Sequence, residues 1–167
     1  MIAPSFPASN RLSLASKPSS FVSRFASHPP HFHADDALSR AKEAAVSGMD
    51  AQTVRLQTIS ENLANIHTTA ADPYSDPYRR RMVVFVYDKA TGKVRVARII
   101  QDPSDFPREH SPMNPAADEQ GFVKLSNVNS LAEMADLRQA DQSFSACLRG
   151  YETIADLEKK VVELIKD

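Results

Sequence analysis

The sequence has little of several residue types on which common catalytic and binding sites depend. It contains a single cysteine, so no internal disulfide can form, and its four glycines are too widely spaced for a phosphate-binding loop. None of its five histidines is placed by the sequence against a carboxylate or a hydroxyl in a recognised catalytic arrangement. We therefore expect no enzyme activity, no metal and no cofactor.

Long apolar runs and a strong net charge are also missing. No apolar run approaches the roughly 18 residues that a membrane-spanning helix needs, so we expect no direct membrane insertion. The formal net charge is −1 at pH 7, which gives no reason to expect binding to nucleic acid.

Residues 1–34 are rich in serine and proline and contain three basic residues but no acidic one. Such a segment buries too little apolar surface to offset the entropy of ordering it, so we expect a disordered N-terminal extension. Its composition is also typical of an organelle transit peptide, and it is equally consistent with an upstream extension from a misplaced start codon.

The longest regular pattern is an apolar stripe near the C-terminus. Its members recur at steps of three and four, which is typical of one face of a helix with heptad spacing. They are Leu137, Ala140, Phe144, Cys147, Tyr151, Ile154, Val161 and Ile165, with Glu158 in the one missing position. Ser130 and Glu133 have the spacing of a capping box, which predicts that the helix starts there.

A second stripe with the same spacing predicts another helix, from about Asp35 to Ile66. Its members are Ala45, Met49, Gln52, Leu56, Ile59, Leu63 and Ile66. Gly48 lies among small residues in this stretch, where another helix can come close, either within the chain or from a neighbouring chain. We expect the two helices to pack together as a coiled coil, because an apolar stripe needs a partner that buries it.

The region between the helices is rich in proline and contains short β patterns. Residues 82–87 and 93–99 predict a hairpin, and residues 121–125 predict a third short strand. The fold class is therefore mainly α with a small β insert. We expect a terminal helical domain made of residues 35–70 and 126–167, and a loop-rich insert at residues 71–125.

Two further features have ordinary interpretations. Cys147 belongs to the apolar stripe, where a thiol behaves as a small hydrophobic group. Residues 79–81 are three consecutive arginines, and at the start of an edge strand such a cluster keeps the edge soluble more often than it meets a phosphate or an acidic partner.

Several motifs then occur in a fixed order along residues 36–167. They are AVSGMDAQ at 45–52, Arg55-Leu56, ENLAN at 61–65, YRR at 78–80 leading into VVF at 83–85, GFVK at 121–124, NVN at 127–129 and Glu133-Met134. Together they resemble the axial proteins of the bacterial flagellum, and among these the basal-body rod proteins. Ser126 stands where the family usually has proline, which suggests a divergent member.

The resemblance implies a structural role. In this family the first and last helices pack together and against neighbouring subunits to form the inner tube of the rod, and the β insert lies outside. The implied partners are other copies of the chain, other rod proteins, the ring and adaptor proteins of the basal body, and the flagellar type III export apparatus. The implied location is the periplasm-spanning rod, reached without a cleaved signal peptide.

We expect the subunit contacts to involve residues of both stripes and the asparagines near them. The asparagines Asn62 and Asn65 are expected to join groups on different helices, because buried amides specify register. The full set of expected interface residues is Gly48, Met49, Leu56, Ile59, Asn62, Leu63, Asn65, Asn127, Asn129, Met134, Phe144, Tyr151 and Ile154.

Other functions remain possible at this stage. The heptad stripes alone would equally permit a cytosolic coiled-coil adaptor or regulator. Another flagellar axial protein is the alternative within the family, although the short chain argues against the longer hook proteins. An enzyme that uses Cys147 is the most distant alternative.

Overall fold

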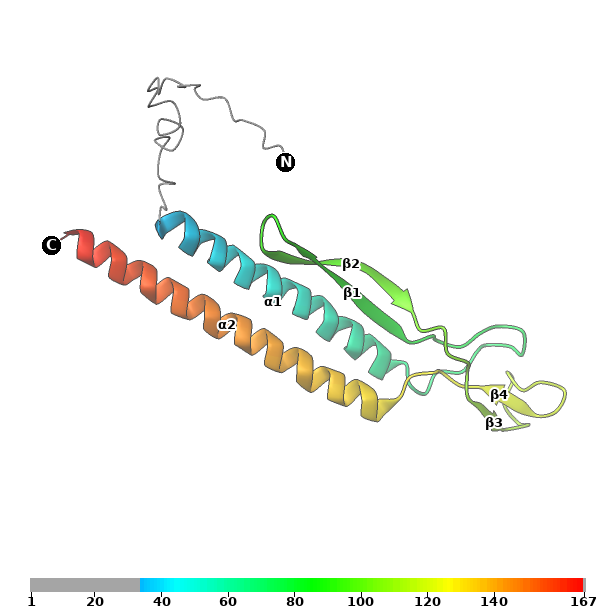
Figure 1. Cartoon of the computed structure of the whole chain (residues 1–167). Helices are drawn as coiled ribbons and strands as arrows, with labels where there is room; N and C mark the ends of the chain where they lie inside the picture. The colour runs from blue at the N-terminus through cyan, green and yellow to red at the C-terminus, as the bar shows by residue number, and fades with distance from the viewer. Residues whose placement is uncertain (1–33, 167) are drawn as a thin grey trace, which may run out of the picture. The chain divides into compact units, whose positions relative to one another are not determined.

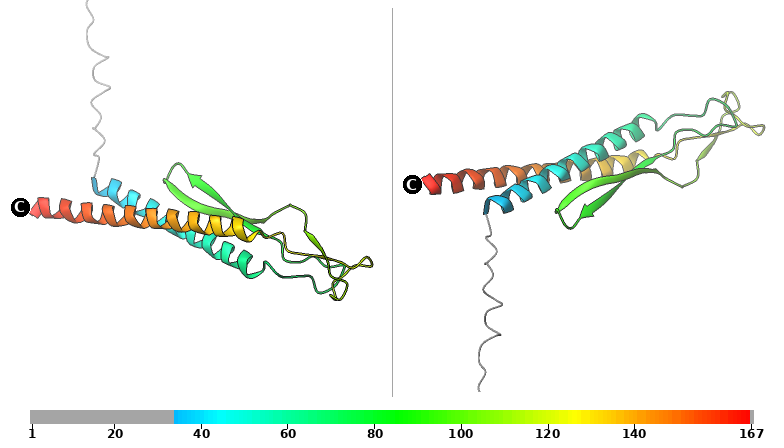
Figure 2. Two further views of the ribbon diagram at one scale, coloured as in Figure 1. Left: turned by 90° about the horizontal axis from the view of Figure 1, so that it is seen from below. Right: turned by 90° about the horizontal axis from the view of Figure 1, so that it is seen from above.

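The computed structural model describes residues 34–166, and the extension expected at residues 1–34 lies outside this range except for Ala34. Two long helices, α1 (Ala34–Ala64) and α2 (Ser130–Lys166), run antiparallel and side by side (Figures 1 and 2). The prediction of long N- and C-terminal helices is thus confirmed. Neither helix, nor any other helix in this part of the chain, is long and apolar enough to cross a membrane.

The two helices approach each other through small side chains. A Cβ atom added to Gly48 of α1 would lie 2.8 Å from Cys147 Sγ of α2, so the glycine leaves room for the thiol. Ala51 and Ile59 of α1 and Ala140 of α2 are buried between the elements. The close approach is possible because Gly48, Ala51 and Ala140 have little or no side chain.

Near the end of the pair where α1 begins and α2 ends, a polar contact takes the place of an apolar one. Glu158 of α2 accepts a hydrogen bond from Lys42 of α1, with 2.6 Å between Nζ and Oε2. The Lys42 ammonium also lies 5.5 Å from the centre of the Tyr151 ring. The missing position in the heptad stripe is therefore filled by an ion pair within the chain.

The start of α2 differs from the prediction. Asn129, not Ser130, is the N-cap: its Oδ1 accepts hydrogen bonds from the backbone N–H groups of Leu131 (3.0 Å) and Ala132 (3.2 Å). Glu133 does not reach back to the helix start, because its carboxylate is engaged elsewhere, as described below. Asparagine and serine are equally good N-cap residues, and the shift of one position follows from the engagement of Glu133 with Arg80 and Asn62.

The predicted hairpin is confirmed as β1 (Arg81–Asp88) and β2 (Lys93–Gln101), which pair antiparallel and lie along α1 (Figure 1). Ala97 is an extra residue in β2, so the register shifts between Val84 and Phe85 and forms a bulge. The turn is closed by Gly92, whose φ of 70° suits glycine. Two contacts fasten the hairpin to α1: the N–H of Val94 donates to Ser47 Oγ, and Lys93 pairs with Glu43.

A second small sheet lies at the end of the helix pair where α1 stops and α2 starts (Figure 1). The predicted third strand is β4 (Phe122–Lys124), and it pairs antiparallel with β3 (Arg108–His110). The sequence analysis did not identify β3, because three exposed residues carry no alternating pattern. Val123, the middle residue of β4, is buried.

Candidate assembly site

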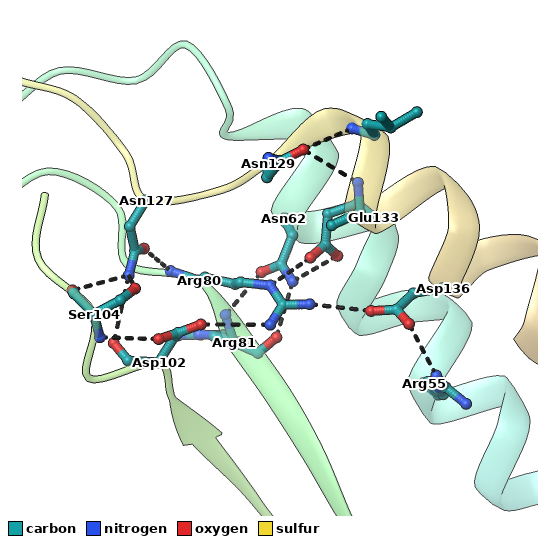
Figure 3. A network of polar contacts seen from close by, with 12 residues as sticks. Arg55, Asn62, Arg80, Arg81, Asp102, Ser104, Asn127, Asn129, Glu133 and Asp136 are labelled. Atoms are coloured by element: carbon teal, nitrogen blue, oxygen red, sulfur yellow. Dashed lines mark hydrogen bonds and ion pairs between the residues drawn. The ribbon is translucent and has the colours of Figure 1, made fainter. Parts of the chain in front are cut away.

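A group of charged and amide side chains lies where α1, the start of β1, the segment after β2 and the start of α2 meet (Figure 3). We call this group the polar junction. Its members are Arg55, Asn62, Arg80, Asp102, Asn127, Glu133 and Asp136.

Glu133 is the centre of the polar junction, and its side chain is 0% exposed. Its Oε1 accepts a hydrogen bond from Arg80 Nε at 2.5 Å, and its Oε2 accepts one from Asn62 Nδ2 at 3.0 Å. A buried carboxylate is tolerated only when it is paired and hydrogen-bonded, and both conditions are met here. Because Asn62 belongs to α1 and Glu133 to α2, this contact joins the two helices directly.

Arg80 uses its whole guanidinium group to bind carboxylates. Besides Glu133, it pairs with Asp136 at 3.0 Å and with Asp102 at 3.4 Å. Burial opposes the charge on Arg80, but the hydrogen bonds to Glu133 and Asp102 and the charges nearby outweigh it and raise the arginine pKa above its ordinary value. Asp136 also pairs with Arg55 of α1 at 3.2 Å.

Asp102 anchors the segment after β2. Its pKa lies below the ordinary value, first because the backbone N–H and the hydroxyl of Ser104 donate hydrogen bonds to it, and further because Arg80 is close; burial acts in the opposite direction. The ionised form is therefore favoured in the folded protein.

Asn62 also fixes the start of β1. Its Oδ1 accepts hydrogen bonds from the Tyr78 hydroxyl and from the backbone N–H of Arg81, both at 2.9 Å, and its Nδ2 donates to the Arg81 carbonyl at 2.8 Å. Burial raises the pKa of Tyr78. With these bonds and the one to Glu133, the amide joins α1 to two other parts of the chain, the start of β1 and α2.

The other three asparagines of the expected interface have different hydrogen-bond partners and different roles. Asn127 Oδ1 accepts from the N–H of Arg80 at 2.7 Å, and its Nδ2 donates to Ser104, so it holds the segments before β1 and after β2 together. Asn129 caps α2. Asn65 lies in the turn just after α1, and its Nδ2 donates to the Glu61 carbonyl of that helix, so in the isolated chain it does not join different helices.

The apolar residues expected at subunit contacts occupy different environments. Ile59 is buried within the chain, and Gly48 faces Cys147. Met134 is 54% exposed. The remaining six, all half-buried along the helix pair, are Met49, Leu56, Leu63, Phe144, Tyr151 and Ile154.

The sequence analysis missed the importance of Arg80 and Glu133. The three arginines were interpreted as a solubilising cluster, whereas only Arg81 is well exposed. Arg79 stacks over the Phe106 ring at 4.0 Å and donates to the carbonyls of Asp102 and Ser104. The signal that could have identified Glu133 was its position on the inner face of α2, seven residues before Ala140.

The described residues include no group of three or more histidine, cysteine, aspartate or glutamate side chains placed to hold a metal ion. What the polar junction can do is mechanical: it fixes the angle between the helix pair and the β hairpin. It also closes the end of the helix pair from which the second sheet projects.

Comparisons with known proteins identify the family of this chain. A sequence-family model described as "Flagella basal body rod protein" matches residues 43–71, and one described as "Flagellar basal body rod FlgEFG protein C-terminal" matches residues 119–164. The FlgC basal-body rod protein of Agrobacterium fabrum is 43% identical over 135 residues, which cover 78% of this chain and 97% of that protein. The chain belongs to the FlgC family.

Other FlgC proteins are similar over the same part of the chain. The protein of Salmonella typhimurium is 34% identical over 132 residues, with 77% of this chain and 98% of that protein covered. The protein of Bacillus subtilis is 31% identical over 141 residues, with 73% and 94% covered. This FlgC family member is a structural subunit of the flagellar basal-body rod and serves motility, and the comparisons favour that role over a cytosolic adaptor.

Proposed function

We propose that this FlgC family member builds the periplasm-spanning part of the rod by packing α1 and α2 against neighbouring subunits, with other copies of the chain and other rod proteins as partners. The observation that carries this proposal is the outer face of α2. Leu131 and Met134, near the start of that helix, are 77% and 54% exposed, although the opposite face of the helix packs on α1. Contiguous exposed apolar patches mark interaction surfaces, and residues three apart on a helix, such as Leu131 and Met134, are neighbours on one face.

The terminal helical domain, residues 35–70 with 126–167, is the assembling part in this proposal, and the insert at residues 71–125 lies outside it. In the described part of the chain, the buried apolar residues contributed by the helix pair are Ala51, Ile59 and Ala140. So small a core supports the proposal that the helices complete their coiled-coil packing, and gain most of their stability, only when neighbours are added.

The remaining partners follow from the same role. We propose that the subunit leaves the cell through the flagellar type III export apparatus without a cleaved signal peptide, and that it contacts ring and adaptor proteins of the basal body. A chain with labile helices is suited to export in an unfolded state.

The first test is a deletion of the gene in the source cell, complemented either with the full chain or with residues 34–167. We expect loss of flagella and swimming in the deletion strain, and restoration by both forms, counted by electron microscopy of hook–basal bodies. A deletion strain with normal flagella would contradict the proposal.

A matched pair of variants tests the exposed face of α2. Met134→Lys places a charge on the proposed subunit contact, while Gln142→Lys places the same charge on another exposed position of the same helix. We expect the first variant to block rod assembly and the second to preserve it, with similar unfolding of both purified chains. Equal flagellation of the two strains would count against a contact at Met134.

Asn65 offers a second test, because its side chain bonds only to α1 in the isolated chain. If it joins helices of different subunits, Asn65→Ala will reduce the number of rods while barely changing the stability of the purified subunit. Normal flagellation of the variant would remove Asn65 from the interface.

A further inference from the structure

Two exposed surfaces of the chain carry opposite charge and are placed where they cannot meet within one copy. The hairpin surface consists of Val86, Lys89, Arg95 and Arg98. The tip surface consists of Pro73, Tyr74, Asp118 and Glu119, which line one hollow beside the second sheet; Tyr74 and Glu119 are exposed, and Pro73 and Asp118 are half-buried. The turn of the hairpin points along α1 toward its N-terminal end, whereas the second sheet lies beyond the opposite end of the helix pair (Figure 1).

The hairpin surface is basic with an apolar patch. Residues 81–101 contain five basic side chains and one acidic side chain. By the strand register, Val86 lies opposite Arg95 and Val84 opposite Arg98, so these four share one face of the hairpin. Among the described residues, Lys89, Arg95 and Arg98 form no salt bridge, so their charges are available to a partner.

The tip surface is apolar with an excess of acid. Tyr74 is 93% exposed, so its ring is available for contact with a partner. Tyr74 borders a hollow of about 530 Å³ that is also lined by Pro73, Ala117, Asp118 and Glu119, with Arg108 as its one cation. Residues 102–125 contain five acidic and two basic side chains.

We propose that the tip surface of one copy binds the hairpin surface of a second copy, a contact that deepens the proposed rod function and rests on it. An arginine of the hairpin would lay its aliphatic stem against Pro73 and place its guanidinium over the Tyr74 ring, within reach of Glu119. Such a site combines ion pairing with cation–π attraction. Because the two surfaces differ, the contact is head-to-tail, and repeated copies form a ring or a helical array.

The experiment uses charge reversal in the purified full chain, with self-association measured by analytical ultracentrifugation at several protein and salt concentrations. We expect both Arg95→Glu with Arg98→Glu, on the hairpin, and Glu119→Lys, on the tip, to weaken association about tenfold. The control Lys160→Glu reverses an exposed charge near the C-terminal end of α2, far from Leu131 and Met134, and should leave association unchanged.

A mixture of the hairpin variant and the tip variant provides the decisive test of the contact. The hairpin variant supplies an acidic hairpin, and the tip variant supplies a more basic tip, so an equal mixture should associate more strongly than either variant alone. A wild-type chain that stays monomeric, an effect of the control as large as that of the variants, or a mixture no stronger than its components would each overturn the proposal.

A cell assay separates this contact from the rod function. If the deletion strain lacks flagella but the charge-reversal variants restore them fully, the contact is wrong while the rod function stands. If the deletion strain keeps its flagella, the rod function itself fails.

Discussion

Removal of the Arg80 guanidinium is the most direct perturbation of the polar junction. In Arg80→Met, the Glu133 carboxylate would stay fully buried with Asn62 as its one remaining donor in the junction. Breaking a buried ion pair by removing one partner costs about 3–5 kcal/mol. We therefore expect the free energy of unfolding to fall by about 3–5 kcal/mol, a large part of the roughly 5–15 kcal/mol typical of a domain.

Removing both charges should cost less than the two single changes together. In Arg80→Met with Glu133→Leu, no uncompensated charge remains at the fully buried position. Asp102 and Asp136 lose a partner but are 20% and 35% exposed, so water can solvate them. We expect the single effects to be non-additive by about 1–3 kcal/mol.

The assay is urea unfolding of the purified chain followed by circular dichroism at neutral pH, with Arg98→Met as the matched control. Arg98 is exposed on β2 and should change stability by no more than about 0.5 kcal/mol. The reasoning is refuted if Arg80→Met costs less than about 1 kcal/mol, or if the two single effects simply add.

Three further predictions concern the helices and the pH dependence. Gly48→Ala should lower the thermal midpoint, because the new methyl group would lie 2.8 Å from the sulfur atom opposite, whereas Gly150→Ala, which has no atom nearby, should add up to about 1 kcal/mol. Asn129→Ala should lower the free energy of unfolding by about 1 kcal/mol and Ser130→Ala by much less. Equal losses of stability in the two variants would contradict Asn129 as the N-cap and favour Ser130. The pKa of Asp102 is lower in the folded protein than in the unfolded chain. The ionised carboxylate therefore stabilises the folded state at pH values above the unfolded pKa, and this stabilisation is lost as the pH falls through the folded pKa. The fall in unfolding free energy below about pH 4 should therefore be shallower in Asp102→Asn, and an unchanged slope would contradict this assignment.

The elements with a periodic residue pattern could be predicted from the sequence. Apolar spacing located both helices, and alternation located β1, β2 and β4. The bounds of α2 were nearly right because both Asn129 and Ser130 are good capping residues, and which of them caps depends on where Glu133 points. That direction is decided by Arg80, 53 residues away in the chain.

The polar junction could not be predicted for the same reason. Asp102, Arg80 and Glu133 come from three segments that only tertiary structure brings together, and a charged residue has no periodic signature. Asn62 was selected as a contact between helices and does bond Glu133, but its bonds to the start of β1 depend on a neighbour that no spacing indicates. Gly48 was recognisable as a place of close approach, although the sequence left open whether the neighbour was Cys147 or another chain.

The helix pair is fastened unevenly along its length. The polar junction holds one end through buried pairs, while near the other end the Lys42–Glu158 pair is 30% and 46% exposed. The N-terminus of α1 and the C-terminus of α2 both lie at this weaker end (Figure 1). A pull on the two ends would thus peel the helices apart one turn at a time, and the mechanical resistance would rise steeply only when the peeling front reached Glu133.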